Sequence, residues 1–294
     1  MDRRTFLASG AAMSVLGSGT QAQGDGFFVP AEEHPHELTF LQWPVSRKVH
    51  PDAVFLDMLQ ATIADIANAV VEFEPVVLLT DAKHHKAARR KLSSAVELWD
   101  IPTEDLWARD SGPIGVIDNQ GNRAIRHIQF NGWGNRQVNR HDGKIAERVA
   151  AEMGLPLLPT NLKGEAGGVE QDGHGLLMAH ESSWVIGNRN PGMSRDAVED
   201  ALLNAYGADR MIWAPGVKDQ DITDYHIDSL ARFTGPGRVL INLPDAADMD
   251  DPFHRSALET TDILQGAGLK VEIIPEPNRR RVNSFDFVAS YANY

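Results

Sequence analysis

A repeated spacing of turns constrains the fold of this chain more than any other feature of its sequence. Three turns that contain glycine and proline or histidine are each followed directly by a predicted strand. The turn residues Pro113, Gly175 and Gly237 are spaced 62 residues apart. Each turn follows a segment rich in acidic side chains, and a predicted helix lies in the interval before the next turn. This period predicts a ββαβ unit repeated around an axis, with acidic side chains directed toward the centre.

The predicted helices and strands fit an α/β protein of one domain, because no linker or low-complexity segment divides the chain after its N-terminal region. Apolar spacing predicts helices over 56–71, 83–98, 144–153 and 196–206, the last with Ser194 as its N-cap. Length and β-branched content predict strands over 38–43, 75–80, 114–117, 176–179 and 239–243. The aromatic segment 285–294 also has a strand pattern.

The N-terminus has the pattern of an export signal. Two arginines, Arg3 and Arg4, precede an apolar stretch of small residues that ends near Ala22. We therefore expect residues 1–22 to be a twin-arginine signal peptide, residues 23–294 to form the domain, and the protein to be periplasmic or secreted. The chain contains no cysteine, so it forms no disulfide in that oxidising compartment.

Charge and hydropathy exclude some partners. The formal net charge of −13 argues against binding to nucleic acid and favours a small cationic substrate. No apolar run approaches the roughly 20 residues of a membrane span. The sequence does not indicate an oligomeric state.

Two short segments have acidic side chains suited to a planar guanidinium ion, which carboxylates bind in pairs. In the first, Asp110 lies next to Arg109 and precedes a Gly-Pro turn. Asp110 is either a guanidinium ligand, with Trp107 as an apolar wall, or the acceptor of a hairpin turn. In the second, Glu165 precedes glycines that allow either close approach to a ligand or a β-bulge.

The segment from Asp224 to Asp228 is the richest in chemistry. In a strand, Asp224, His226 and Asp228 would share one face. Histidine with carboxylates suits either a metal centre or an acid–base histidine beside a substrate carboxylate. A metal centre usually needs a further cluster of ligands, so we expect neither a metal nor another cofactor. The segments 131–135 and 187–192 are typical of turns and indicate only loops.

Taken together, these segments resemble the family of agmatine deiminases and bacterial, Porphyromonas-type peptidylarginine deiminases. The resemblance runs from about residue 30 to the end of the chain. It is carried, in order, by Leu41-Gln42-Trp43-Pro44, Trp107-Ala108-Arg109-Asp110-Ser111-Gly112-Pro113, Asn131-Gly132-Trp133-Gly134, Glu165 with its glycines, Asn188-Arg189-Asn190-Pro191-Gly192, Thr223-Asp224-Tyr225-His226-Ile227-Asp228, Leu230-Ala231-Arg232-Phe233 and Ser290-Tyr291-Ala292-Asn293.

The resemblance implies a pentein, a five-bladed α/β propeller of ββαβ units, of which this chain would cover about four blades. It implies that Asp110 and Asp228 hold the guanidinium and that His226 transfers protons. The further substrate contacts expected are Trp107, Glu165, Trp43 and Arg109. The implied reaction converts agmatine to N-carbamoylputrescine and ammonia, and peptidyl-arginine is the alternative substrate.

Two departures from the family pattern affect these expectations. The family's nucleophile is a cysteine in a Gly-Gly-Gly-x-x-His-Cys segment, expected beyond the last residue of this chain. The glycine that usually precedes the catalytic histidine is Tyr225 here. A non-catalytic guanidinium-binding remnant and a metal-dependent hydrolase using His226 therefore remain as alternative hypotheses.

Overall fold

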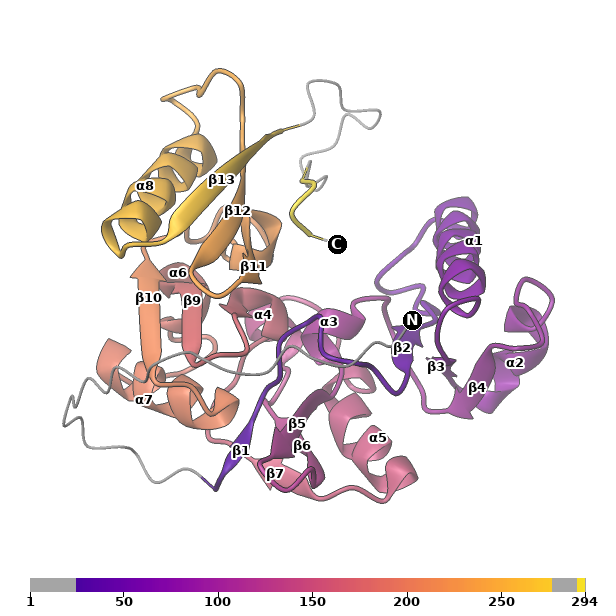
Figure 1. Cartoon of the computed structure of the whole chain (residues 1–294). Helices are drawn as coiled ribbons and strands as arrows, with labels where there is room; N and C mark the ends of the chain where they lie inside the picture. Colours follow the sequence, from indigo (N-terminus) through magenta and orange to yellow (C-terminus); the bar gives the residue numbers. More distant parts are fainter. Residues whose placement is uncertain (1–24, 277–289, 294) are drawn as a thin grey trace, which may run out of the picture.

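The computed structural model describes residues 25–276 and 290–293, which form an α/β fold with four separate sheets. Figure 1 shows the sheets placed around a common centre, where the short helix α3 (Ala108–Ser111) lies. The longer helices α5, α7 and α8 lie on the outer side of this arrangement (Figure 1). The predicted signal peptide, residues 1–22, lies outside the described residues.

The N-terminal sheet is entirely parallel. Its strands are β2 (Thr39–Gln42), β3 (Val76–Thr80) and β4 (Glu97–Asp100), with β3 in the middle. The connections are α1 (Ala53–Val70) and α2 (Ala82–Ala88). Among the described residues, this sheet therefore has the order βαβαβ, without the antiparallel hairpin expected of a repeated unit.

The other three sheets each contain a ββαβ unit, as the sequence predicted. The first strand pairs antiparallel with the second, and the second pairs parallel with the third. The units are β5 (Ile114–Asp118), β6 (Arg123–His127), α5 (Ile145–Met153) and β7 (Leu157–Pro159); β8 (Val169–Gln171), β9 (Leu176–His180), α7 (Arg195–Tyr206) and β10 (Arg210–Ala214); and β11 (Ala231–Gly235), β12 (Arg238–Leu243), α8 (Pro252–Gly266) and β13 (Lys270–Pro275). The short strand β1 (Phe27–Phe28) adds to the first unit by pairing antiparallel with β5.

The predicted 62-residue period was wrong for the first unit. The turns at Gly175 and Gly237 join the first and second strands of their units, whereas the turn at Pro113 precedes the first strand. The equivalent hairpin turn of the first unit contains Gly121, whose φ is +81°. The second strands begin at residues 123, 176 and 238, so the first interval is shorter than 62 residues.

The helix predicted over 83–98 was also too long. Helix α2 ends at Ala88, and the chain turns and returns as β4, which pairs parallel with β3. The Asn68 side chain stabilises this turn, since it donates to the Lys91 carbonyl (3.0 Å) and accepts from the Ser93 amide (2.6 Å). Burial of Val96 in the core overrides the helical pattern of the sequence.

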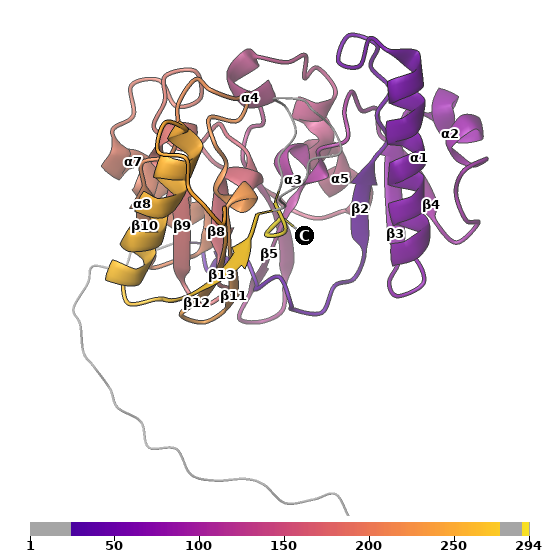
Figure 2. The same cartoon turned by 90° about the horizontal axis from the view of Figure 1, so that it is seen from above.

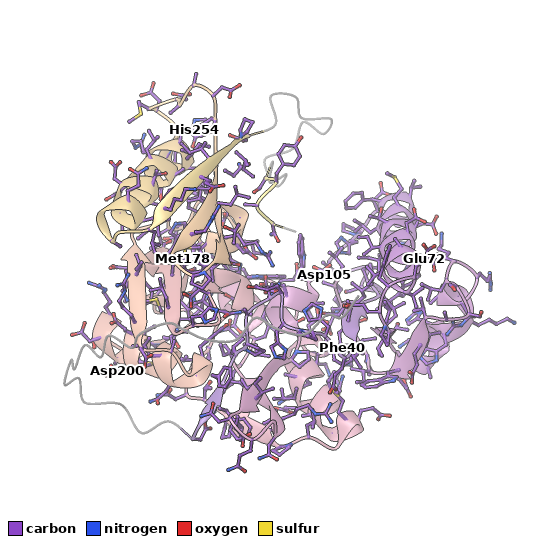
Figure 3. The ribbon with its side chains drawn as sticks, in the orientation of Figure 1. Phe40, Glu72, Asp105, Met178, Asp200 and His254 are labelled. Atoms are coloured by element: carbon purple, nitrogen blue, oxygen red, sulfur yellow. The ribbon has the colours of Figure 1, made fainter. Side chains whose placement is uncertain are left out.

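Apolar side chains fill the space between each sheet and its helices, as Figure 3 shows. Met178 on β9 is buried there, whereas Asp200 on α7 and Glu72 after α1 lie on the outside. Helix α1 is the one helix of the described segments that is long and apolar enough to cross a membrane. Its buried residues Ile63 and Ala67 pack in the same apolar cluster as Leu78 of β3.

Short elements connect the sheets near the centre of the molecule. They are α4 (Gly132–Asn135), α6 (Glu181–Trp184) and the 3₁₀ turns η1 (Asp142–Lys144), η2 (Ala166–Gly168) and η3 (Ile227–Ser229). In the view of Figure 2, α3 lies between the N-terminal sheet and the sheet of β11–β13. Of the predicted C-terminal strand, residues 285–289 and 294 lie outside the described part, and residues 290–293 form no strand.

Candidate active site

The candidate site is centred on the backbone of Gly167 in η2. A Cβ atom added to Gly167 would lie 2.6 Å from Asp110 Oδ1, 2.6 Å from Asp228 Oδ2 and 2.9 Å from His226 Nδ1. The three side chains with expected catalytic roles therefore converge on one point, although they come from two segments that are far apart in the sequence. Only glycine leaves room for them, because real Cβ contacts are not this short.

Asp110 is held by donors on both carboxylate oxygens. It lies in α3, where Oδ2 accepts from Trp133 Nε1 (2.8 Å) and Oδ1 accepts from the Gly167 amide (3.2 Å). Burial raises the pKa of Asp110, while the imidazole of His226 acts in the opposite direction. Trp133 itself has a positive φ of 53° in α4, between two glycines that also have positive φ.

The segment from Asp224 to Asp228 is not a strand, so the expected alternation of faces was wrong. Asp224 and Tyr225 have positive φ values of 60° and 66°, and the chain then enters the turn η3. This path brings His226 and Asp228 together at Gly167. The Asp224 carboxylate instead binds Arg136 and Arg189 (2.8 and 2.7 Å).

His226 is surrounded by carboxylates. Its Nε2 lies 3.2 Å from Glu165 Oε2, and its Nδ1 lies 3.7 Å from Asp110 Oδ1. Burial alone would lower the pKa of His226, but these two carboxylates and Asp228 outweigh burial and raise it to about 9. The imidazole is therefore protonated at neutral pH.

Asp228 is a buried carboxylate beside the His226 imidazole. Its exposed fraction is 8%, and no residue of the described segments donates a hydrogen bond to its carboxylate. Burial raises the pKa of Asp228 to about 6, although the imidazolium of His226 partly opposes this effect. A buried carboxylate without a partner is a costly arrangement unless a cation completes it.

The other expected contacts lie in different surroundings. Trp107 is half exposed, and Arg109 Nη1 binds Glu32 Oε1 at 2.7 Å. Trp43 is 1% exposed and packs in the apolar cluster between α1 and β3. Its expected contact with the substrate stays a prediction.

The sequence analysis missed three residues of this region. Trp133 and Arg189 lie in the segments interpreted only as loops, yet Trp133 binds Asp110, and Arg189 binds Glu165 with Nε (2.8 Å). Glu170 on β8 is also buried, and burial raises its pKa to about 7 despite the opposing charges of Arg232 and Arg109. Trp133 and Arg189 each donate to an acid that is distant in the sequence, and no local sequence pattern indicates such a pair.

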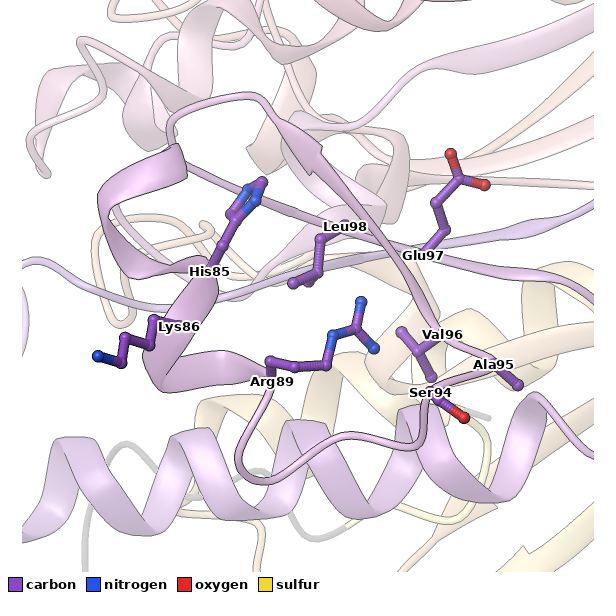
Figure 4. A pocket seen from close by; sticks show the side chains of 8 residues that line it. All are labelled: His85, Lys86, Arg89, Ser94, Ala95, Val96, Glu97 and Leu98. Carbon is purple, nitrogen blue, oxygen red and sulfur yellow. The ribbon is translucent and has the colours of Figure 1, made fainter.

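The cavity beside α2 does not coincide with the cluster of Asp110, His226 and Asp228. Figure 4 shows a wide cavity of about 620 Å³ beside α2, lined by residues such as His85, Lys86, Arg89 and Glu97. It lies on the N-terminal sheet and includes none of the converging residues. In the part of the chain that the structure describes, no group of three or more His, Asp or Glu side chains is placed to hold a metal ion.

The geometry defines what the cluster can do chemically. Two carboxylates face one point beside a protonated imidazole, and a third carboxylate supports that imidazole. Such a set can accept the N–H groups of a planar cation and can deliver a proton to a group that leaves it.

Comparisons with known proteins agree with this chemistry. Residues 28–294 match the sequence model of the Porphyromonas-type peptidyl-arginine deiminase family. A candidate agmatine deiminase of Streptomyces coelicolor is 33% identical over 85% of this chain and 76% of its own length. One of Selenomonas ruminantium is 32% identical over 83% of this chain and 68% of its own length.

The fold is also similar to a solved structure, a cysteine-to-serine variant of the C. jejuni agmatine deiminase with substrate bound. The TM-score is 0.79 with 23% identity, over 91% of this chain and 79% of that chain. At this identity, the similarity supports the fold alone.

Proposed function

Because the chain belongs to the Porphyromonas-type peptidyl-arginine deiminase family, we propose that its site binds the guanidinium group of agmatine and serves its hydrolysis. The reaction consumes agmatine and water and releases N-carbamoylputrescine and ammonia. The relatives from Streptomyces coelicolor and Selenomonas ruminantium are described as agmatine deiminases, which supports this choice of substrate.

The observation that carries the proposal is the convergence of Asp110, Asp228 and His226 on Gly167. A guanidinium ion placed beside Gly167 would donate N–H groups to both carboxylates, in the paired geometry that suits its planar shape. It would also supply the donor that Asp228 does not receive from the described residues. The cation thereby offsets the cost of burying that carboxylate.

His226 is suited to the two proton transfers of the reaction. At neutral pH its imidazole carries a proton, because its pKa is raised to about 9. It would give this proton to the departing nitrogen, so that ammonia leaves in place of an amide anion. The neutral imidazole would then accept a proton from the attacking water, and Glu165 would stabilise the imidazolium that forms again.

The covalent step needs a nucleophile that attacks the guanidinium carbon, which is a cysteine thiolate in the family that the sequence resembles. The 294 residues include no cysteine. We therefore assign to these residues the binding of the cation and the proton transfers, and not the covalent step. A guanidinium-binding protein without turnover is the second candidate function.

The proposal extends to the fold and to the alternative substrate. The three ββαβ units around a common centre support a pentein with these units as blades. Peptidyl-arginine presents the same guanidinium, and the description of the matching family names it. The export signal at residues 1–22 remains a prediction.

Calorimetric titration tests the proposed binding. Agmatine is titrated into the protein, with putrescine as the control that keeps the amine and lacks the guanidinium, and benzoyl-arginine amide as the peptidyl analogue. Binding of agmatine and not of putrescine supports the proposal, and equal or absent binding of both overturns it. Release of ammonia on incubation with agmatine separates turnover from binding alone.

A further inference from the structure

We propose that Arg189 is a positioning residue that holds the Glu165 carboxylate against His226 and thereby sets the protonation of that imidazole. This inference rests on the proposed role of His226 in proton transfer. Arg189 lies between α6 and α7, in a segment that sequence analysis interpreted only as a loop. It does not touch the point at Gly167 where the substrate would bind.

Arg189 is a completely buried guanidinium whose hydrogen bonds divide between two segments. Its side chain is 0% exposed. Nε donates to both oxygens of Glu165, at 3.1 and 2.8 Å. Nη1 donates to Asp224 Oδ2 (2.7 Å), and Nη2 donates to the Thr223 carbonyl (3.1 Å). One side chain therefore ties the segment that precedes Gly167 to the segment that precedes His226.

The Glu165 carboxylate is the link between Arg189 and the imidazole. Its Oε2 accepts from Arg189 and also lies 3.2 Å from His226 Nε2. Glu165 is 1% exposed, so water does not compete for these contacts. Because Arg189 donates to both oxygens of Glu165, it fixes the direction from which the carboxylate faces the ring.

The two Nη groups of Arg189 support the turn that places His226, since they donate to Asp224 and Thr223. Asp224 and Tyr225 have positive φ, which is an unfavourable conformation for residues other than glycine. Arg136 also binds Asp224, from the more exposed side, with Nη1 at 2.8 Å and Nη2 at 3.0 Å. Among the described residues, Arg136 does not contact Glu165, and it is therefore a matched control for Arg189.

The titratable groups that face His226 come from four elements. They are Asp110 of α3, Glu165 before η2, Asp228 of η3 and the neutral His180 of β9, whose pKa burial lowers to about 4. Only Glu165 in this set is bound to a guanidinium. If Arg189 no longer binds it, the carboxylate is not held against the ring and attracts the imidazolium less.

The test is a double-mutant cycle read from the titration of the His226 imidazole by NMR, in the free protein with labelled histidine. Arg189→Lys keeps the charge but cannot bind Glu165 and Asp224 together in the geometry of the guanidinium fork. We expect it to lower the titration midpoint of His226 by about one pH unit, a tenfold change in proton affinity. Arg136→Lys, which leaves Glu165 in place, should not shift the midpoint.

The same substitution is then made in a Glu165→Gln background. If Arg189 acts through Glu165, Arg189→Lys produces no further shift there. Equal shifts from Arg189→Lys in both backgrounds, or equal shifts from Arg189→Lys and Arg136→Lys, would overturn the inference. If Arg189→Lys does not fold, the titration midpoint of His226 is compared between Glu165→Gln and Glu165→Gln/Arg189→Gln. Different midpoints in these two proteins would overturn the inference.

This experiment is independent of agmatine binding. A wild-type protein that fails to bind agmatine contradicts the proposed function, whereas the titration of His226 still shows whether Arg189 acts on the imidazole. Conversely, agmatine binding with no effect of Arg189→Lys on the His226 midpoint contradicts only the role of Arg189.

Discussion

Replacement of Asp228 by asparagine has two opposite consequences, a loss of ligand affinity and a gain in stability. The substitution keeps the size of the side chain and removes its charge. Asp228 is 8% exposed and receives no hydrogen bond from the described residues, so its carboxylate can accept N–H groups of a bound cation, although the charges of Arg109 and Arg232 also act on it. Loss of one partner from a buried charge pair costs about 2–5 kcal/mol, so agmatine affinity should fall by a factor of roughly 30 to several thousand.

The stability change follows from the raised pKa of Asp228. An acid whose folded pKa lies above its unfolded value destabilises the fold when it is ionised, so stability falls as pH rises from about 4 to about 6. The pKa of about 6, against the ordinary value of 3.8 for an aspartate, corresponds to a destabilisation of at most about 3 kcal/mol at neutral pH. Asp228→Asn should therefore raise the melting temperature by several degrees at pH 7, and this gain should disappear near pH 4.

Calorimetry with agmatine and thermal unfolding by circular dichroism measure the two effects in the same samples. Glu272→Gln is the control, since Glu272 is an exposed carboxylate on β13 and its loss changes the net charge equally. It should alter neither quantity appreciably. Unchanged agmatine affinity in folded Asp228→Asn, or a lower melting temperature at pH 7, would refute the assignment of Asp228 as an unpartnered buried anion that awaits a cation.

Three further predictions concern the same site. Agmatine affinity should be constant between about pH 7 and pH 8, below the pKa of His226, and should fall by up to tenfold per pH unit below about 6, because protonation of Asp228 removes its charge. A flat profile below pH 6 would contradict the role of Asp228. Gly167→Ala should abolish agmatine binding, because its Cβ would occupy the point where the site groups converge, whereas Gly187→Ala, with no atom within 4 Å of its added Cβ, should bind as the wild type does. Trp133→Phe should lower affinity about tenfold in calorimetry, since it removes the donor to Asp110 Oδ2 and keeps the apolar ring, and an unchanged Kd would show that this donor does not orient the carboxylate.

Much of the fold could be predicted because its elements have strong local patterns. The apolar spacing of α1, α5 and α7 and the β-branched segment of β3 lead directly to the observed elements. The position of each turn within the repeated unit could not be predicted from such local patterns. The turns at Pro113 and Gly175 have similar compositions, but only strand pairing shows that the first precedes a unit and the second lies inside one.

The site residues that could be predicted are acidic residues and a histidine within unusual local sequences. Partners that are distant in the sequence and meet only in the folded protein could not be predicted. Asp110, His226 and Asp228 were selected from their own segments, and the structure brings them to one point. The face predicted for Asp224 was wrong, because alternation assumes a strand and two consecutive residues have positive φ here. Arg189 was overlooked because its importance depends on distant acids that no spacing along the chain reveals.

A crystal structure of the protein with agmatine tests the central claim most directly. We predict that the guanidinium lies beside Gly167, with N–H groups about 2.7–3.2 Å from carboxylate oxygens of both Asp110 and Asp228 and with its carbon facing His226. Agmatine bound elsewhere, for example in the cavity beside α2, or a fully loaded complex in which Asp228 still has no donor, would contradict the account.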